Sequence, residues 1–187
     1  MQLTGKEDLR VQKTLISIHK TFRELLLEKD YEKITVKELC ERAMINKKTF
    51  YTYYETLDFL LFEMQEQISS EYRERIKSYT LKDMEKLVRE FFMFSEEQGE
   101  FYEKITCGGT YTKIREQMIM KVSSDRDIYP ELSGFPQAEQ NMIRTFLAES
   151  LLAMYRTWIM DGKKIPVQRA IEITSEALIH GVKNYMK

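Results

Sequence analysis

Apolar residues recur along most of the chain at spacings of three and four, which is the period of an amphipathic helix. The clearest stretch runs from about Leu9 to Glu28, where one stripe is formed by Val11, Leu15, Ile18, Phe22, Leu25 and Leu26. No stretch alternates between apolar and polar residues as a half-buried strand would, and the sequence has no internal repeat. The pattern therefore predicts an all-α fold.

Two short helices are predicted between Thr35 and Tyr54. Thr35-Val36-Lys37-Glu38 has the form of a capping box, in which the threonine hydroxyl accepts a backbone N–H and the glutamate side chain reaches back to the cap. Asn46 is a good N-cap for the second helix, Lys47 to Tyr53. The residues expected to face inward are Val36, Leu39, Cys40, Ala43, Ile45 and Phe50.

The rest of the chain is predicted to be helical as well. Thr56 should cap a long helix that extends to about Ser78, and Gly162 should end another helix. The other predicted helices are Leu81 to Gln98, Thr112 to Ser123, Gln137 to Met160 and a last helix reaching about Met186, with a loop over Asp125 to Pro136. This order predicts a three-helix domain, residues 1–55, joined by the long helix to a helical domain, residues 56–187.

Composition limits the possible functions. The 187 residues include 7 glycines and 3 prolines, too few for a sheet-rich or disordered chain, and the net charge is −1. Affinity for nucleic acid must therefore come from a local basic patch. No apolar run approaches the roughly 20 residues of a membrane span, and no signal peptide is visible, so a cytoplasmic protein is expected. Cys40 and Cys107 have neither a disulfide pattern nor metal-ligand spacing.

The sequence contains no catalytic signature. It lacks a glycine-rich phosphate loop, a nucleophile motif and an H-E-x-x-H metal motif. The two histidines, His19 and His180, are far apart in sequence, and His19 is expected to be exposed on the polar side of the first helix. We therefore expect no enzyme activity, no cofactor and no metal site.

The strongest functional pattern is the pair of short helices, which has the form of a helix-turn-helix over about residues 35–54. From Lys33 to Tyr54 five basic residues stand against two acidic ones, whereas the whole chain is slightly acidic. The second helix presents polar side chains that can enter a major groove about 12 Å wide and reach phosphates or base edges. These side chains are Lys47, Lys48, Thr49, Tyr51, Thr52 and Tyr53.

From about Leu9 to Met64 the sequence resembles the DNA-binding domain of TetR-type transcriptional regulators. The likeness is carried by residues 34–43 (ITVKELCERA), by residues 45–54 (INKKTFYTYY), by the aromatic Tyr31 and by Leu60-Leu61. It implies double-stranded DNA as a partner, contacted by the helix-turn-helix residues above together with Thr35, Arg10 and Lys13. Two positions depart from the family pattern: Met44 replaces a frequent turn glycine, and Leu57 replaces a frequent phosphate-binding lysine.

The C-terminal part resembles a subgroup of these regulators common in Firmicutes, around residues 154–162 (MYRTWIMDG). The resemblance implies a homodimer in which the last two long helices pair with those of a second copy. The residues predicted at that interface are Phe146, Leu151, Met154, Tyr155, Ile171, Thr174, Ala177 and Leu178.

An aromatic and methionine-rich set is a candidate pocket for a small apolar or aromatic effector, since bundle helices often enclose pockets. Its members are Phe91, Phe94, Tyr102, Tyr111, Met118 and Trp158, and an ordinary hydrophobic core is the alternative explanation.

Three hypotheses about function follow. The first is a transcriptional regulator, a repressor, that binds a palindromic operator as a homodimer and is released by a small molecule. The second is a DNA-binding protein without a small-molecule effector, either an activator or co-regulator controlled by a protein partner or a nucleoid-associated protein. The third is a helical adaptor whose helix-turn-helix no longer binds DNA, an idea supported only by Met44 and Leu57.

Overall fold

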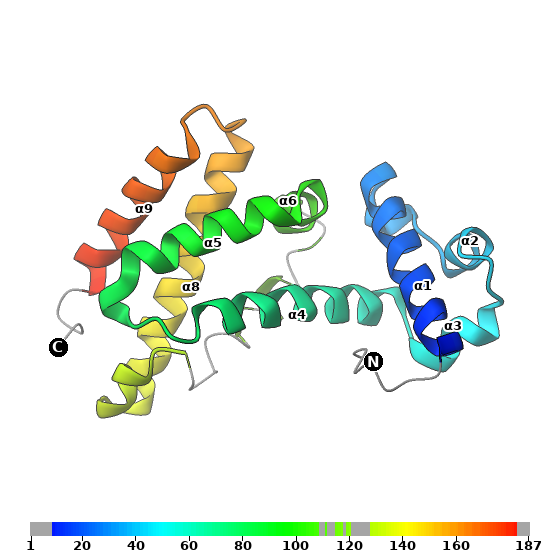
Figure 1. The fold of residues 1–187 in the computed structure, drawn as a ribbon, viewed down its shortest axis with the longest axis horizontal. Coiled ribbons are helices and arrows are strands. Elements are labelled where there is room, and N and C mark those ends of the chain that lie inside the picture. The colour runs from blue at the N-terminus through cyan, green and yellow to red at the C-terminus, as the bar shows by residue number, and fades with distance from the viewer. Residues whose placement is uncertain (1–8, 109–110, 112–114, 118, 121–127, 183–187) are drawn as a thin grey trace. The chain divides into compact units, whose positions relative to one another are not determined.

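A computed structural model describes residues 9–108, 111, 115–117, 119–120 and 128–182 (Figure 1). Every regular element within these ranges is helical, which confirms the all-α prediction. The longer helices are α1 (Leu9–Glu28), α4 (Leu57–Ile76), α5 (Met84–Gln98), α8 (Gln137–Met160) and α9 (Val167–Val182). The shorter elements are η1 (Tyr31–Lys33), α2 (Val36–Arg42), α3 (Lys47–Tyr53), η2 (Leu81–Asp83), α6 (Glu100–Cys107) and η4 (Pro130–Gly134).

The chain forms two compact units, residues 1–69 and 70–187. The division falls inside α4, so the N-terminal part of this helix belongs to the first unit. The sequence prediction placed the boundary at residues 55 and 56, where α4 is about to begin. The difference arises because Leu60 and Leu61 of α4 are fully buried, as are the core residues of α1.

The core of the first unit is the predicted stripe of α1 packed against α2, α3 and the start of α4. Phe22, Leu39 and Phe50 are completely buried, and Tyr54 is 1% exposed. Two contacts tie α2 to α1: Arg42 makes a two-pronged ion pair with Glu28, and Ser17 donates a hydrogen bond of 3.1 Å to the carbonyl of Ala43. These two contacts fix α2 to α1.

The predicted N-caps are present, although one differs in detail. Thr35 Oγ1 accepts the backbone N–H of Glu38 at 3.2 Å, and Asn46 Oδ1 accepts that of Thr49 at 2.7 Å. The reciprocal half of the capping box does not form, because the Glu38 carboxylate accepts a hydrogen bond from Lys29 instead. A salt bridge from Lys29, the residue that follows α1, thus replaces a purely local contact.

The turn between α2 and α3 keeps a regular geometry despite its methionine. Met44 adopts φ 55°, and Ile45 N–H bonds to the carbonyl of Cys40 at 2.9 Å, as in a Schellman motif. Met44, which is 91% exposed, adopts the left-handed conformation that glycine takes more readily.

In the second unit α9 packs against both α5 and α8, as Figure 1 shows for the red, green and yellow helices. Tyr155 of α8 is fully buried between Phe91 and Phe92 of α5, with ring centroids 5.6 and 5.4 Å away. The turn after α8 is anchored by Lys163, whose ammonium lies 2.7 Å from Glu103 and 3.1 Å from Glu96. Of the described residues, no helix is both long and apolar enough to cross a membrane.

The sequence prediction missed α6. Gly99 adopts φ 68°, ends α5 and serves at once as the N-cap of α6, so no loop separates the two helices. The predicted helix Thr112 to Ser123 and the end of the last predicted helix lie largely outside the described residues. The predicted loop before α8 contains η4.

Met44→Gly should stabilise the fold by about 0.5–1 kcal/mol, because glycine accepts the left-handed conformation without the penalty of a Cβ, partly offset by its greater entropy when unfolded. The free energy of unfolding from urea titration measures the change. Met44→Ala retains the Cβ and is the control. Equal stabilities of the glycine and alanine variants would show that Met44 is unstrained.

Candidate nucleic-acid interface

The packing of α3 determines which of its side chains meet solvent. Phe50 is completely buried and contacts the ring of Tyr54, with centroids 5.7 Å apart. On the other side Lys47, Lys48 and Thr52 are exposed and Tyr51 is 55% exposed. Most of the predicted DNA-binding side chains therefore share the outward face of one helix.

Lys47 and Lys48 differ from the other basic residues of this patch in their ion pairing. Three other basic residues of the patch have acidic partners: Lys33 pairs with Asp30 at 2.8 Å, Lys37 with Glu41 at 3.8 Å and Arg42 with Glu28 at 2.6 Å. Within the described part of the chain neither Lys47 nor Lys48 has such a partner. The positive charge counted in the sequence is thus concentrated at the start of α3.

This placement opposes the stability of α3 itself. The N-terminal end of a helix carries partial positive charge, so cations there cost roughly 0.3–1 kcal/mol each, and acidic residues are preferred. The first turn of α3 contains two lysines and no acidic residue. The stability of α3 therefore does not account for the two lysines.

The three predicted threonines also have structural roles. Thr35 caps α2, Thr49 donates its hydroxyl to Asn46 at 3.0 Å, and Thr52 donates to the carbonyl of Lys48 at 2.9 Å. The hydroxyl hydrogens of Thr49 and Thr52 are already donated within the chain, and the Thr35 oxygen already accepts the Glu38 N–H. Thr35 and Thr52 are exposed, whereas Thr49 is half-buried. The exposed Thr35 and Thr52 could therefore contact bases through their methyl groups more easily than through hydrogen-bond donation.

The remaining predicted contacts lie around this helix in the first unit. Tyr53 is half-buried, while Arg10 and Lys13 are exposed on the first turns of α1. Leu57 is half-buried as the first residue of α4 and offers no charge for a phosphate.

A buried polar cluster beneath α3 was not anticipated. Tyr54 at the end of α3 donates its hydroxyl to Glu63 of α4 at 2.9 Å and lies 2.8 Å from Nε2 of His19 on α1. Since the hydroxyl hydrogen is used on Glu63, His19 Nε2 must be the donor in the second bond. Burial lowers the pKa of His19 and raises that of Tyr54 to about 12, so both side chains stay neutral at pH 7.

This cluster corrects the expectation that His19 is exposed: its side chain is 21% exposed and faces α3 and α4. The stripe pattern placed it at the edge of the apolar face, and only the approach of Tyr54, 35 residues later, covers it. The cluster fixes the end of α3 to the two longer helices, and so fixes the direction in which the lysines point.

The predicted effector residues form an aromatic cluster in the second unit. Phe91 and Phe94 both contact Tyr72, with centroids 5.5 and 5.7 Å apart, and Tyr102 contacts Tyr155 at 6.2 Å. Tyr111 is buried, Met118 lies outside the described residues, and Trp158 lines a cavity of about 190 Å³ near the turn after α8. Ring packing accounts for most of this set, and a ligand there stays a prediction.

The predicted dimer residues divide into two groups. Leu151, Tyr155, Ile171, Thr174 and Leu178 are at most 9% exposed and are covered by helices of the same chain. The reason is that α8 packs against α6 and α9, so more than one of its faces is used internally. Phe146 and Ala177 are exposed and Met154 is half-buried, so only these three remain available to a partner.

Among the described residues no group of histidine, cysteine, aspartate or glutamate side chains is arranged to hold a metal ion.

Several solved structures share this fold. A TetR transcriptional regulator from Streptococcus agalactiae 2603V superposes with a TM-score of 0.65 at 21% identity, over 90% of this chain and 95% of that one. The dihydroxyacetone kinase operon activator DhaS gives 0.58 at 19% identity, over 91% and 96%. The fatty acid degradation regulator FadR from Bacillus halodurans gives 0.57 at 12% identity, over 92% and 96%.

No protein-family model and no curated protein sequence matches this chain. At these identities the structural likeness establishes the fold: the chain has the fold of TetR-type regulators. All three named neighbours are described as regulators or activators.

Tyr54→Phe should reduce the free energy of unfolding by about 1–3 kcal/mol, because it removes two hydrogen bonds and leaves a histidine and a carboxylate with less compensation for burial. Urea denaturation measures the loss. Tyr51→Phe, which removes an exposed hydroxyl from the same helix, should leave stability unchanged. A Tyr54→Phe variant as stable as the parent would mean that the cluster does not hold α3 in place.

Proposed function

We propose that this chain is a sequence-specific DNA-binding transcriptional regulator that acts as a homodimer on a palindromic operator. The observation that carries the proposal is the pair of unneutralised lysines on the outward face of α3. A short helix with an exposed basic start and a tyrosine suits the major groove, where lysines reach phosphates and the tyrosine reaches base edges or a thymine methyl.

An exposed apolar stripe on α8 supports the homodimer. Met142 is 75% exposed, Phe146 43% and Met160 68%, and these residues recur at helical spacing along one face. Phe146 also lies over Gly181 of α9, where an added Cβ would come within 2.8 Å of its ring. Large exposed apolar side chains that share one helical face are typical of an interface, and a second copy would cover them.

Two subunits would present two copies of α3 to the two halves of an inverted repeat, about 34 Å apart. Repression follows when such a dimer blocks transcription, and a small molecule that alters the spacing would release it. The second candidate is activation, favoured by one observation: the fold is shared with a protein named as an operon activator. Both candidates need the same DNA-binding surface.

Selection from a random duplex library tests the function. The full chain should enrich an inverted repeat whose half-sites lie about one helical turn apart. Recovery of unrelated sequences at low salt would overturn sequence-specific binding, and no recovery at all would favour the adaptor hypothesis.

Lys48→Ala should weaken binding to the selected DNA about tenfold and reduce the slope of log affinity against log salt by about one, because one phosphate contact is lost. Fluorescence anisotropy at several salt concentrations measures both. Lys33→Ala is the matched control, since that lysine is already paired with Asp30, and it should change affinity little. Equal effects of the two substitutions would contradict the assignment of Lys48 to DNA.

Phe146→Glu should convert the dimer to a monomer, because a carboxylate would be buried without a counter-charge at the proposed interface. Light scattering after size exclusion measures the mass. Met93→Glu is the control: Met93 of α5 has the same 43% exposure but lies off the α8 stripe, and that variant should stay dimeric. A monomeric parent chain at micromolar concentration would refute the homodimer.

A further inference from the structure

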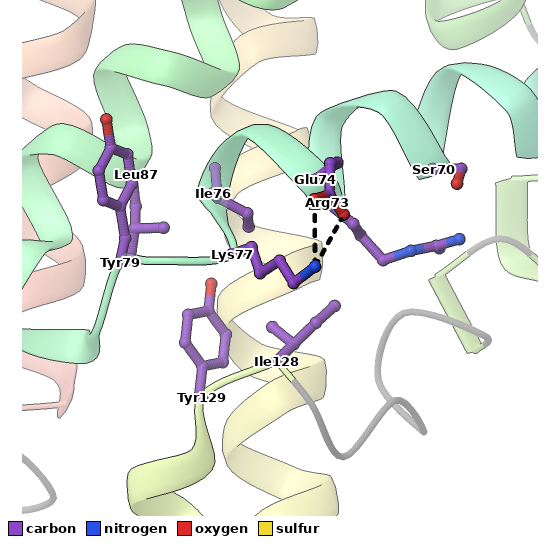
Figure 2. A pocket seen from close by; sticks show the side chains of 9 residues that line it. All are labelled: Ser70, Arg73, Glu74, Ile76, Lys77, Tyr79, Leu87, Ile128 and Tyr129. Atoms are coloured by element: carbon purple, nitrogen blue, oxygen red, sulfur yellow. Dashed lines mark hydrogen bonds and ion pairs between the residues drawn. The ribbon is translucent and has the colours of Figure 1, made fainter.

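A cavity of about 190 Å³ lies in the second unit between the end of α8 and the start of α9. The apolar residues in its wall are Met154, Trp158, Ile165, Ala170 and Ile173. A larger cavity at the end of α4, about 260 Å³, differs because charged side chains line it, and its Lys77 and Glu74 pair with each other at 3.1 Å (Figure 2). The smaller cavity is the one whose wall suits an apolar occupant.

The buried polar groups of this wall are already hydrogen-bonded within the chain. The indole N–H of Trp158 donates to the carbonyl of Ile165 at 2.8 Å, and the Thr174 hydroxyl donates to the carbonyl of Ala170 at 2.7 Å. Water inside the cavity would therefore find few partners, whereas an ordered buried water makes about two to four hydrogen bonds. An apolar group fills such a space better than water does.

A bulky apolar side chain lies on the same side of α8, about three turns from the cavity. Phe146 is 43% exposed and lies against Gly181 of α9, where an added Cβ would come within 2.8 Å of the ring. Phe146, Ala153 and Thr157 are spaced by seven and four residues, which places them on one side of the helix. Thr157 lines the cavity, and it lies about 16 Å along α8 from Phe146.

The surface between the ring and the cavity carries small side chains. Ala153 of α8 and Ala177 of α9 are both exposed there. Ala177 lies midway along α9 between Ile173 in the cavity wall and Gly181 under the ring. Small side chains let a partner helix approach closely. One face of the α8–α9 pair thus has a projecting ring at one end, a cavity at the other and a low surface between them.

Such a face is complementary to a second copy of itself. Rotation by 180° about an axis through its middle, beside Ala153 and Ala177, exchanges its two ends. The ring of each copy then meets the cavity of the other, as in an isologous interface, where residue i contacts residue j and j contacts i. A phenyl ring suits the space, since an engineered apolar cavity of about 150 Å³ holds benzene.

Charges near the two ends of α8 agree with this rotation. Glu139 lies seven residues before Phe146, and Lys164 lies seven residues after Thr157. An antiparallel arrangement that brings Phe146 to Thr157 therefore brings Glu139 of one copy close to Lys164 of the other. Both side chains are exposed, and among the described residues neither has an ion-pair partner. A parallel arrangement would instead oppose like charges.

We propose that the homodimer forms by reciprocal insertion, in which the exposed edge of the Phe146 ring of each subunit enters the cavity beside Trp158 of the other. The cavity is then incomplete in a single chain, because its occupant comes from the partner. The inference rests on the homodimer of the proposed function. It adds the place of the two-fold axis, beside Ala153 and Ala177, and the residues that meet across it.

Cysteine pairs that leave the ring in place test the arrangement in the full chain. Met142 lies four residues before Phe146 and Asp161 four residues after Thr157, so these two residues should also meet across the interface. Met142→Cys combined with Asp161→Cys should give a covalent dimer on mild oxidation, visible on a non-reducing gel and lost on reduction.

Met142→Cys combined with Thr145→Cys is the matched control. Both residues are exposed at the same end of α8, and the variant retains Cys40 and Cys107 as the test pair does. It should give little covalent dimer. Equal cross-linking of the two pairs, or none from the pair at residues 142 and 161, would overturn the arrangement.

Exchange of side chains tests the insertion itself. Phe146→Ala should weaken the dimer about tenfold or more, because the cavity loses its ring. Thr157→Phe should weaken it as well, because a ring from the same chain then occupies the cavity. The double variant should dimerise more tightly than either single variant, since its cavity is filled and no ring from the partner has to enter.

Sedimentation velocity over a dilution series measures these dimers, and circular dichroism melting checks that each variant is folded. Met93→Ala is the control, because Met93 has the same 43% exposure as Phe146 but lies on α5. A dimer that Phe146→Ala leaves unchanged, or effects of the two substitutions that simply add, would assign the cavity to another occupant, such as a small apolar molecule, and overturn the insertion.

The two proposals can fail separately. A chain that dimerises with this cross-linking pattern but selects no DNA would leave the insertion standing and refute the proposed regulator. A dimer that selects an inverted repeat without this pattern would refute the insertion alone. A chain that is monomeric at micromolar concentration would refute the homodimer and the insertion together.

Discussion

The burial of Phe50 and of Tyr54, which follows the last residue of α3, is the constraint on which the outward surface of this helix depends. Because these rings occupy the inner face of a helix only seven residues long, every other side chain of α3 is directed to the rim or to solvent. The hydroxyl of Tyr54 then meets His19 and Glu63, so the same residue that fills the core also locks α3 to α1 and α4. The direction of the outward lysines is therefore set by the buried Phe50 and by the hydrogen bonds of Tyr54.

Lys47 and Lys48 destabilise the start of α3, and the phosphates of bound DNA would offset this repulsion. Lysines at the start of a helix oppose its dipole, yet the packing of Phe50 and the caps at Thr35 and Asn46 keep the helix formed. The neighbouring basic residues are paired with carboxylates and contribute less to an external field. A chain that is slightly acidic overall can thus still present a focused basic surface.

Most of the large apolar side chains in the second unit pack inside the chain and are not available to a partner or a ligand. Tyr155, Trp158 and Phe92 pack against one another inside the chain, which leaves a narrower stripe around Phe146 for a partner. Polar groups meanwhile gather at the end of α4, where Arg144 holds Tyr129 in a strained conformation. α4 is continuous from Leu57 to Ile76 and contributes Glu63 to the buried cluster beside α3.

Periodicity and capping act within a few residues, so the elements that depend on them can be predicted from the sequence: α1, α3 and α8 with their observed bounds, and the outward residues of α3. The other features are set by the folded chain. The unbroken passage from α5 to α6 depends on the backbone angles of Gly99, and the burial of His19 on a residue 35 positions away. Likewise, whether an apolar side chain on α8 faces its own core or a partner depends on which helices pack around it, and spacing along one helix does not contain that information.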